Sequence, residues 1–412
     1  MMKETEMKRV PKLRFPEFTD DWEQRKVTEI GNIVTGSTPK TSIVENYGGE
    51  FLFISPADIQ GNRYINETVT TLTQKGFSQG RKIRKKASLF VSIGSTIGKV
   101  AQTTRESTTN QQINAVEPYD DFDDDFIFTS LENVSGNIKA IASNQAVPIV
   151  NKTTFGEVEL AVPSDLNEQK AIGEFFFTLD HLITLHQRKL EKLKELRKGV
   201  MKKLFSQEVR FKADDGSEFS EWEKKKIGDV FSKIKDKNKD GRNQNVITNS
   251  AEFGLINQRD FFDKDIAVDG KTENYTVIKT GDFVYNPRKS KQAPYGPFNC
   301  YKLEENGIVS PLYTCLRPKS NVNDKYLLWY FKSGSWYRFI YENGAQNGAR
   351  HDRVGMTDFL MQEIPVYLPQ AVEEQQKIAE CLSALDDVIE KQKATLAAWE
   401  ELKKGLLQQM FV

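Results

Sequence analysis

Cysteine and histidine are scarce in this chain of 412 residues, which contains three of each. The cysteines are Cys300, Cys315 and Cys381, and the histidines are His181, His186 and His351. Disulfide frameworks and zinc clusters need several closely spaced cysteines, so neither is expected, and free thiols suit a reducing cytoplasm. The scattered histidines do not predict a catalytic triad or a histidine metal site. We therefore predict no catalytic, cofactor-binding or metal-ligating residues in this chain.

Long apolar runs and net charge are missing as well. No hydrophobic stretch is long enough to span a membrane, and residues 1–4 do not lead into a signal-peptide core, so we expect a cytoplasmic protein. The chain has 58 basic and 58 acidic residues. A strongly basic domain is the usual electrostatic sign of nucleic-acid binding, and it is absent. Net charge alone therefore decides nothing about DNA.

What is present is a duplication. Residues 168–205 align without a gap with residues 374–411, at a constant offset of 206. Glu168 falls on Glu374 in this alignment, and Phe205 falls on Phe411. The segments before the two copies also resemble each other, because an Arg-Phe, a Glu-Phe and a Trp-Glu pair recur at offsets that drift between 196 and 201. The chain thus reads as globule, helix, globule, helix.

Both repeated segments carry the apolar spacing of a coiled coil. The steps alternate between four and three residues, which averages close to the period of ~3.5 that keeps one seam facing a partner helix. Polar residues interrupt the two ladders on identical rungs, and such interruptions fix register and pairing. We expect the two helices to pair, although two amphipathic helices on separate cores remain the alternative. The predicted seam residues are Ile172, Leu179, Ile183, His186, Leu190, Leu193, Ile378, Leu385, Ile389, Gln392, Leu396 and Trp399.

Charge favours the same pairing. Residues 164–206 carry nine basic and six acidic side chains, whereas residues 370–412 carry five and eight. An antiparallel pair would place the globules at opposite ends of a spacer of ~50 Å, given ~1.5 Å per helical residue. We expect a mixed α/β (α+β) fold, with globules at residues 1–163 and 207–369 and spacer helices at 164–206 and 370–412. Short apolar runs at 51–54 and 88–91 predict buried strands of the first globule.

These features resemble a known family. The Pro163 lead-in, the pair Glu168 and Gln169, and the long helix ending at Phe205, all present twice, are similar to specificity subunits of type I restriction–modification systems. The resemblance covers the full length. It implies that each globule is a target-recognition domain for one half of a bipartite DNA site. It also implies an antiparallel coiled coil that spaces the halves and holds two modification subunits, which would bind S-adenosylmethionine, while restriction subunits would join to cleave.

Two motifs are near misses for enzymatic chemistry. The loop 94–99 has glycines and a lysine like a phosphate-binding loop, but only three residues separate the glycines and Val100 follows the lysine. A loop that approaches a DNA backbone, or a plain hairpin turn, is the better interpretation. Residues 285–288 resemble the Asn-Pro-Pro-aromatic loop of adenine methyltransferases, but Arg288 and Lys289 replace the second proline and the aromatic residue. Phosphate contact or a solvated turn remains.

The DNA-binding candidates are basic side chains for phosphates and polar side chains on loops for base edges. Each has a bland alternative, a solvated face or a capped turn. The acidic run 120–125 would repel DNA, so it is expected to point away or to start a helix. The candidates are Ser37, Thr38, Arg81, Lys82, Arg84, Lys85, Lys86, Ser95, Thr96, Lys99, Asn110, Gln111, Gln112, Arg288, Lys289, Lys291, Gln346, Asn347 and Arg350.

The sequence thus predicts a non-catalytic, DNA-binding specificity subunit that directs adenine methylation and restriction by its partners. Two other classes are kept open. A self-contained enzyme would need cofactor-dependent activity from the chain alone, which the two defective motifs argue against. A protein–protein scaffold with two end modules would show no DNA sequence preference.

Overall fold

The computed structural model describes residues 10–142, 149–261, 272–320, 322–343 and 352–412. They form a mixed α/β fold in two compact units, Met1–Leu190 with Lys391–Val412 and Glu191–Glu390. These units do not follow the four expected segments, because each combines a globule with the start of one long helix and the end of the other. The exact domain boundaries stay a prediction.

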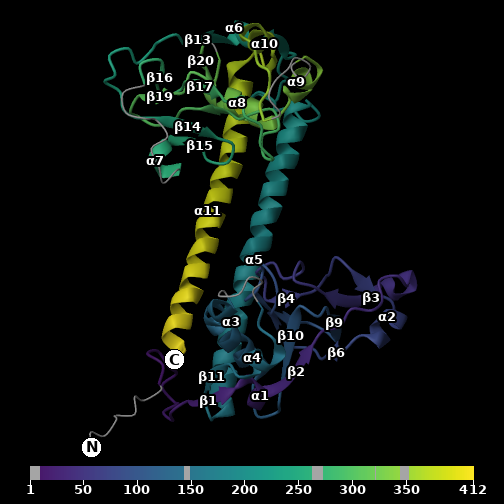
Figure 1. Cartoon of the computed structure of the whole chain (residues 1–412). Coiled ribbons are helices and arrows are strands. Elements are labelled where there is room, and N and C mark those ends of the chain that lie inside the picture. The colour runs from purple at the N-terminus through teal and green to yellow at the C-terminus, as the bar shows by residue number, and fades with distance from the viewer. Residues whose placement is uncertain (1–9, 143–148, 262–271, 321, 344–351) are drawn as a thin grey trace, which may run out of the picture. The chain divides into compact units, whose positions relative to one another are not determined.

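The first unit contains most of its strands in two sheets (Figure 1). One sheet has the order β2-β10-β7-β8-β4, the other β5-β3-β9-β6, and β1 pairs with β11. The strands are β1 (Glu23–Lys26), β2 (Gly31–Thr35), β3 (Tyr47–Ile54), β4 (Tyr64–Ile65), β5 (Thr71–Leu72), β6 (Lys82–Ile83), β7 (Ser88–Val91), β8 (Val100–Thr103), β9 (Ser107–Thr109), β10 (Ile113–Pro118) and β11 (Glu159–Val162). The helical segments are α1 (Val27–Ile30), η1 (Val44–Asn46), α2 (Gln74–Gln79), α3 (Asp124–Ala142) and α4 (Lys152–Gly156).

The second unit repeats the core of this plan. Its main sheet has the order β13-β20-β17-β18, and the pairs β12-β21, β14-β15 and β16-β19 lie beside it. The strands are β12 (Glu223–Lys226), β13 (Phe231–Lys233), β14 (Ile247–Ser250), β15 (Gly254–Asn257), β16 (Thr276–Ile278), β17 (Phe283–Tyr285), β18 (Phe298–Cys300), β19 (Gly307–Val309), β20 (Thr314–Pro318) and β21 (Pro365–Leu368). The helices are α6 (Ile227–Val230), α7 (Gln258–Phe261), α8 (Asp324–Ser333), α9 (Tyr337–Asn343) and α10 (Asp358–Glu363).

The strand pairing shows the duplication directly. β1 pairs antiparallel with β11, with Glu23 opposite Val162, and β12 pairs antiparallel with β21, with Glu223 opposite Leu368. β10 lies between β2 and β7 as β20 lies between β13 and β17. The two strands predicted from apolar runs are present, because residues 51–54 end β3 and residues 88–91 are β7, whose side chains are all buried.

Two long helices, α5 (Leu166–Phe205) and α11 (Val372–Met410), match the predicted spacer segments. In the first unit, Asp180 and His186 of α5 contact Lys403 and Gln392 of α11, so rising numbers on one helix meet falling numbers on the other. In the second unit, Arg197 of α5 contacts Asp386 of α11. The helices therefore pair antiparallel within each unit.

Each long helix begins in one hydrophobic core and ends in the other. The core of the first unit includes Ile172 near the start of α5 and Phe411 just after α11. The core of the second unit includes Ile378 near the start of α11 and Phe205 at the end of α5. The aromatic ring of Phe411 stacks on Phe126 with ring centroids 5.6 Å apart. Burial of such large aromatic groups ties each helix end to its globule.

Candidate nucleic-acid interface and its supports

The repeated lead-in forms the junction between globule and helix. In the first unit, Arg14 donates to both carboxylate oxygens of Glu168, at 2.6 and 2.7 Å. In the second, Arg210 donates to both oxygens of Glu374, at 3.0 and 2.9 Å. Both glutamates are buried, and bidentate pairs of this kind fix orientation as well as adding energy. The hydrogen bond to its glutamate is the main reason that the pKa of each arginine is raised.

The next residue of each repeat completes the junction. Gln169 donates from Nε2 to the carbonyl oxygen of Pro163 (2.9 Å), and Gln375 donates to that of Pro369 (2.8 Å). The Oε1 atom of Gln169 also accepts from the backbone N–H of Asp123, just before α3. The Pro…Glu-Gln motif thus holds each long helix against its globule. These contacts explain why the motif occurs at both junctions.

The predicted seam residues are all buried or half-buried, and so are Arg197 and Lys403, the second pair of polar interruptions. His186 and Gln392 occupy the same position of the two repeats and contact each other: the Nε2 atom of Gln392 lies 2.7 Å from the Nδ1 atom of His186. It also donates to the carbonyl oxygen of His186 at 3.1 Å. When two copies of one helix pair antiparallel, one position of the repeat lies opposite its own counterpart, and His186 and Gln392 occupy that position. Polar groups of this kind specify the register of the pairing.

The other pair of matching polar rungs forms ion pairs with one repeated aspartate. Lys403 contacts Asp180 at 2.6 Å in the first unit, and Arg197 contacts Asp386 in the second. Their surroundings differ. The side chains of Lys403 and Asp180 are 13% and 7% exposed, against 30% and 27% for Arg197 and Asp386. The contact of Lys403 with Asp180 is therefore much less accessible to solvent than that of Arg197 with Asp386.

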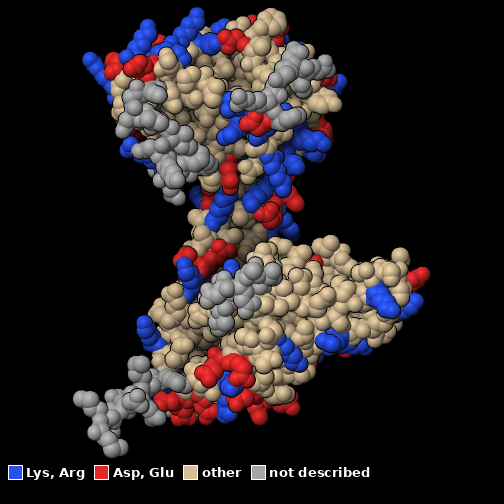
Figure 2. Space-filling view, viewed as in Figure 1, with Lys and Arg blue, Asp and Glu red and all other residues tan. Residues whose placement is uncertain are grey.

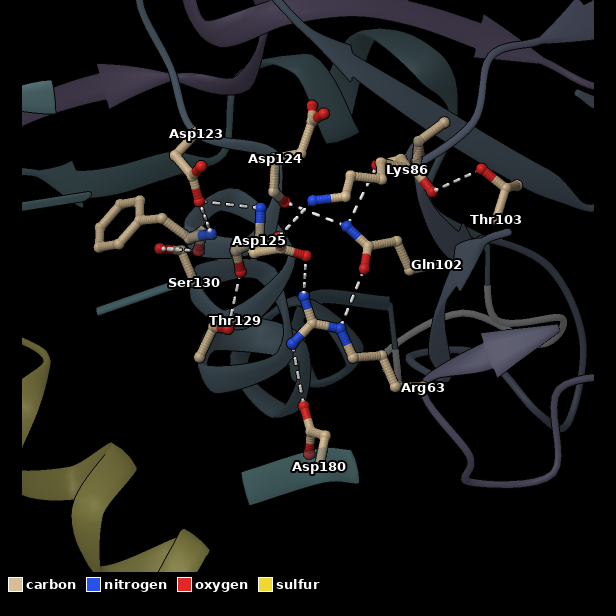
Figure 3. Close-up of polar contacts among 12 residues, drawn as sticks. Arg63, Lys86, Gln102, Thr103, Asp123, Asp124, Asp125, Thr129, Ser130 and Asp180 are labelled. Carbon is tan, nitrogen blue, oxygen red and sulfur yellow. Dashed lines mark hydrogen bonds and ion pairs between the residues drawn. The ribbon is translucent and has the colours of Figure 1, made fainter. Parts of the chain in front are cut away.

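Lys403 belongs to a buried charge network around Arg63. Figure 3 shows the Arg63 guanidinium between Asp125 at the start of α3 and Asp180 on α5, with N–O distances of 2.5 and 3.1 Å. Its Nε atom donates to Gln102 of β8 at 3.0 Å, and its side chain is only 2% exposed. One arginine thus fastens the sheet, α3 and α5 together.

On the other side of the network, Lys403 contacts Glu132 of α3 at 2.6 Å. Burial raises the pKa of Glu132, and the Lys403 ammonium opposes that rise. Burial lowers the pKa of Lys403, but Glu132 and Asp180 outweigh it and raise the pKa above its ordinary value. The ammonium therefore stays charged and ties α11 to α3 and α5.

The predicted basic run 81–86 is only partly available to a ligand. Arg84 forms a bidentate pair with Asp124. Lys86 contacts Asp125 at 2.7 Å (Figure 3). The acidic run does start a helix, since α3 begins at Asp124. The Nζ atom of Lys82 lies 4.9 Å from the centre of the Phe77 ring. Lys85 is exposed. As DNA contacts, all these residues stay predictions.

Four polar candidates of the first unit lie together. The hydroxyl of Thr38 donates to Oε1 of Gln111, and the backbone N–H of Arg81 donates to the hydroxyl of Ser37 at 3.1 Å. The Arg81 guanidinium donates to the carbonyl oxygen of Thr35 at 2.9 Å. In Figure 2, uncharged side chains predominate on the visible face of the first unit, with lysines and arginines in small separate groups. This face of the first unit therefore presents no broad group of basic side chains.

The loop with Ser95, Thr96 and Lys99 joins β7 to β8, two neighbouring antiparallel strands. A phosphate-binding loop joins a strand to a helix N-terminus, so this connection has the wrong architecture for one. The Nζ atom of Lys99 donates to the carbonyl oxygen of Ile59 at 3.0 Å. Gly94 and Gly98 have φ of 97° and 89°, which suits a tight hairpin connection.

In the second unit, the loop after β17 lines a groove of about 350 Å³. Arg288 and Lys289 line it together with Arg353, which the sequence interpretation missed. Arg353 has no local motif, and only its antiparallel bridge with Arg288 brings it there. Lys291 is exposed on the same loop but is not among the residues that line the groove. Gln346, Asn347 and Arg350 lie outside the described residues.

The described residues hold no group of three or more metal-ligating side chains that could bind a metal ion. Within the same ranges, every helix is too short or too polar to cross a membrane.

Known proteins match this chain over both halves. The sequence profile described as "Type I restriction modification DNA specificity domain" matches residues 19–195 and again residues 219–398. The HindI specificity subunit of Haemophilus influenzae is 30% identical over 196 residues, 46% of this chain and 42% of that protein. The MjaIX specificity subunit of Methanocaldococcus jannaschii is 27% identical, over 56% of this chain and 54% of that protein. The chain thus spans about half the length of these two relatives.

Longer matches exist as well. The MjaVIII specificity subunit of M. jannaschii is 23% identical over 98% of this chain and 95% of that protein. The crystal structure of a type I restriction–modification S subunit from M. genitalium superposes with a TM-score of 0.61 and 16% identity, over 98% of this chain and 99% of that one. At this identity, the likeness is one of fold.

Proposed function

The chain belongs to the family of type I restriction–modification specificity subunits, whose domain profile matches most of it in two copies, and from that premise we propose how its parts divide the work. Each globule reads one half of a split site in double-stranded DNA. The long helices set the spacing between the half-sites. The chain itself catalyses no reaction; modification subunits bind S-adenosylmethionine and methylate adenine, and restriction subunits cleave.

The observation that carries this proposal is the repeated junction. Arg14 with Glu168 and Arg210 with Glu374 hold two equivalent globules on two equivalent helices by the same bidentate pair. Two equivalent globules, each held on a long helix by the same contacts, would bind two separated segments of one ligand. A bipartite DNA site has that form.

The helices also carry features suited to two copies of one partner. Leu196 and Leu402, at the same repeat position, are 52% and 47% exposed. Three residues further, on the same helix face, stand Gly199 and Gly405, and a Cβ atom at either glycine would meet nothing within 4 Å. Glycine inside a helix costs ~0.5–1 kcal/mol relative to alanine, and the chain carries this cost twice without an internal packing reason. We assign these two spots to the docking of two modification subunits.

The test is to co-express the chain with its cognate modification subunit and to map adenine methylation across a genome by single-molecule sequencing. We expect one split motif, methylated on both strands and lost when this chain is omitted. A stable complex that produces no such motif would favour a scaffold without DNA sequence preference.

A further inference from the structure

The two near-miss motifs occupy the same place in the repeated sheet. The loop 92–99 connects β7 to β8, and the loop 286–297 connects β17 to β18. β7 and β17 are equivalent strands. In the first unit the order β2-β10-β7-β8 places β7 between β10 and β8, and in the second unit the order β13-β20-β17-β18 places β17 between β20 and β18. The two loops share no sequence pattern, so only the topology reveals the equivalence.

The surroundings of the loops are equivalent too. The backbone N–H of Val150 donates to Ser92 and that of Val354 donates to Pro287, each to the carbonyl oxygen at 2.8 Å. Isolated bridges join Ile93 to Ile149 in one unit and Arg288 to Arg353 in the other. We call this place the sheet corner: residues 92–99, 110–112 and 149 in the first unit, and 286–297, 310–312 and 353 in the second.

The turns before β10 and β20 complete each sheet corner. The backbone N–H of Gln112 donates to Oδ1 of Asn110 at 3.1 Å, and that of Leu312 donates to the hydroxyl of Ser310 at 3.3 Å. In the first unit, the backbone N–H of Ser92 also donates to the carbonyl oxygen of Gln112 at 2.8 Å. Loop and turn are therefore hydrogen-bonded into one surface in the first unit, and in the second unit both line the same groove.

The second corner has a rigid floor. Asn249, 4% exposed, donates from Nδ2 to the carbonyl oxygen of Val284 at 2.7 Å, and Asn286 donates to the carbonyl oxygen of Asn249 at 3.1 Å. Gly296 has φ of 86°, and a Cβ atom there would lie 2.1 Å from the carbonyl oxygen of Asn286. This loop is thus a built structure, and it presents its charged side chains from fixed backbone positions.

Chemistry separates the two corners. In the second, Arg288 is 69% exposed, and one oxygen of Asp352 lies 3.8 Å from the Nε atoms of both Arg288 and Arg353. That carboxylate lies near both guanidinium groups, and both arginines line the groove. In the first corner, exposed or half-buried amides take their place, at Gln111 and Gln112.

We propose that each sheet corner contacts the base edges of its half-site, with Arg288 and Arg353 reading guanine and with Gln111 and Gln112 reading adenine. The proposal rests on the DNA-recognition function proposed above. Arginine matches the O6 and N7 acceptors of guanine with two parallel bonds, and a glutamine amide matches N6 and N7 of adenine in the same way. The two units therefore use one structural position with different base preferences.

The test uses the complex with the modification subunit and the same methylation map. The variants are R288A/R353A and Q111A/Q112A. The controls are K279A, which removes an exposed cation at the opposite end of β17, and N66A, which removes an exposed amide beyond the end of β4 farthest from the β7–β8 loop. R288K/R353K keeps both charges but loses the fork that pairs with guanine.

R288A/R353A is expected to reduce the preference for guanine at one or two positions in one half of the motif by about 5- to 150-fold, the value of a bidentate base contact. Q111A/Q112A should relax an adenine position in the other half, and both controls should keep the wild-type motif. R288K/R353K should weaken the preference for guanine at the same motif positions as R288A/R353A. If R288A/R353A does not assemble with the modification subunit, the motif of the lysine variant tests the proposal instead.

An unchanged motif in all variants would overturn the proposal while leaving the split-site function intact. A uniform loss of methylation at every site without relaxed bases would also overturn it, since it would show phosphate contacts only. Failure of the wild-type complex to methylate any split motif would instead refute the underlying function.

Discussion

Replacing Lys403 by methionine should destabilise the first unit, because it leaves the buried carboxylate of Asp180 and the half-buried carboxylate of Glu132 without the ammonium that both contact at 2.6 Å. Removing one partner of a buried ion pair costs about 3–5 kcal/mol. Glu132 is 28% exposed, so the lower end of that range applies, about 3 kcal/mol. Arg63 remains beside Asp180 and prevents a larger loss.

The matched control is Arg197→Met at the same repeat position in the second unit. Arg197 and Asp386 are about a third exposed, and Lys332 also lies 4.0 Å from Asp386. A pair so accessible to solvent contributes roughly 1 kcal/mol or less. The same chemical change at equivalent positions should therefore differ several-fold in cost.

Hydrogen exchange followed by mass spectrometry measures both costs locally. At pH 7.5, peptides from α3 should exchange about 150-fold faster in K403M, whereas peptides from α8 should change by about 5-fold or less in R197M. Equal effects of the two substitutions, or unchanged protection of α3, would refute the reasoning.

The loss in K403M should shrink as pH falls. The pKa of Glu132 is already raised in the folded state, and removing Lys403 raises it further. A raised carboxyl pKa contributes stability below the unfolded pKa, and this contribution is lost as pH rises through the folded pKa. The difference between K403M and the wild type should therefore be smaller near pH 5 than at pH 7.5.

Three further predictions concern the junctions, a close backbone approach and a buried thiol. Glu374→Ala should lower the stability of the second unit by about 3 kcal/mol, and Glu168→Ala should cost the first unit more because Glu168 also accepts from a tryptophan indole; equal losses in urea denaturation would count against this difference. Gly36→Ala should lower the free energy of unfolding by about 1–3 kcal/mol, since its Cβ atom would lie 2.1 Å from a carbonyl oxygen. Gly136→Ala, on the open face of α3, should raise the free energy of unfolding by up to about 1 kcal/mol. Thermal unfolding that ranks the two variants in the reverse order would be inconsistent with the packing. Burial raises the pKa of Cys315 to about 12, so iodoacetamide at pH 8 should label this thiol only after unfolding; rapid labelling of the native chain would contradict its burial.

The repeat and the paired helices were predictable from the sequence because both depend on the local spacing of residues. A constant offset of 206 and a period near 3.5 need no knowledge of long-range contacts. A helix start was one of the two outcomes expected for the acidic run 120–125, because acidic residues suit a helix N-terminus, and α3 begins at Asp124. The contact between Arg63 and Asp180 was not predictable, since these residues are 117 positions apart in sequence and meet only through the fold.

The candidate site was predicted less completely than the fold. The basic run 81–86 suggested phosphate contacts, but Arg84 and Lys86 pair with Asp124 and Asp125 of the acidic run that lies further along the sequence. Arg353 was missed because an isolated arginine carries no signal until a strand bridge places it beside Arg288. The equivalence of the two sheet corners was equally hidden, since it lies in strand order and not in residue identity.

We propose that two globules read DNA and that two paired helices set the distance between their half-sites. One heptad should be removed from each helix near residues 190 and 390, at the unit boundaries in the chain, with facing segments taken from both helices so that the seam keeps its phase. This shortens each helix by ~10 Å, which corresponds to about three base pairs of DNA. Methylation mapping of the variant complex should show the same two half-sites with a gap about three base pairs shorter. Altered half-site sequences, or an unchanged gap, would contradict the account.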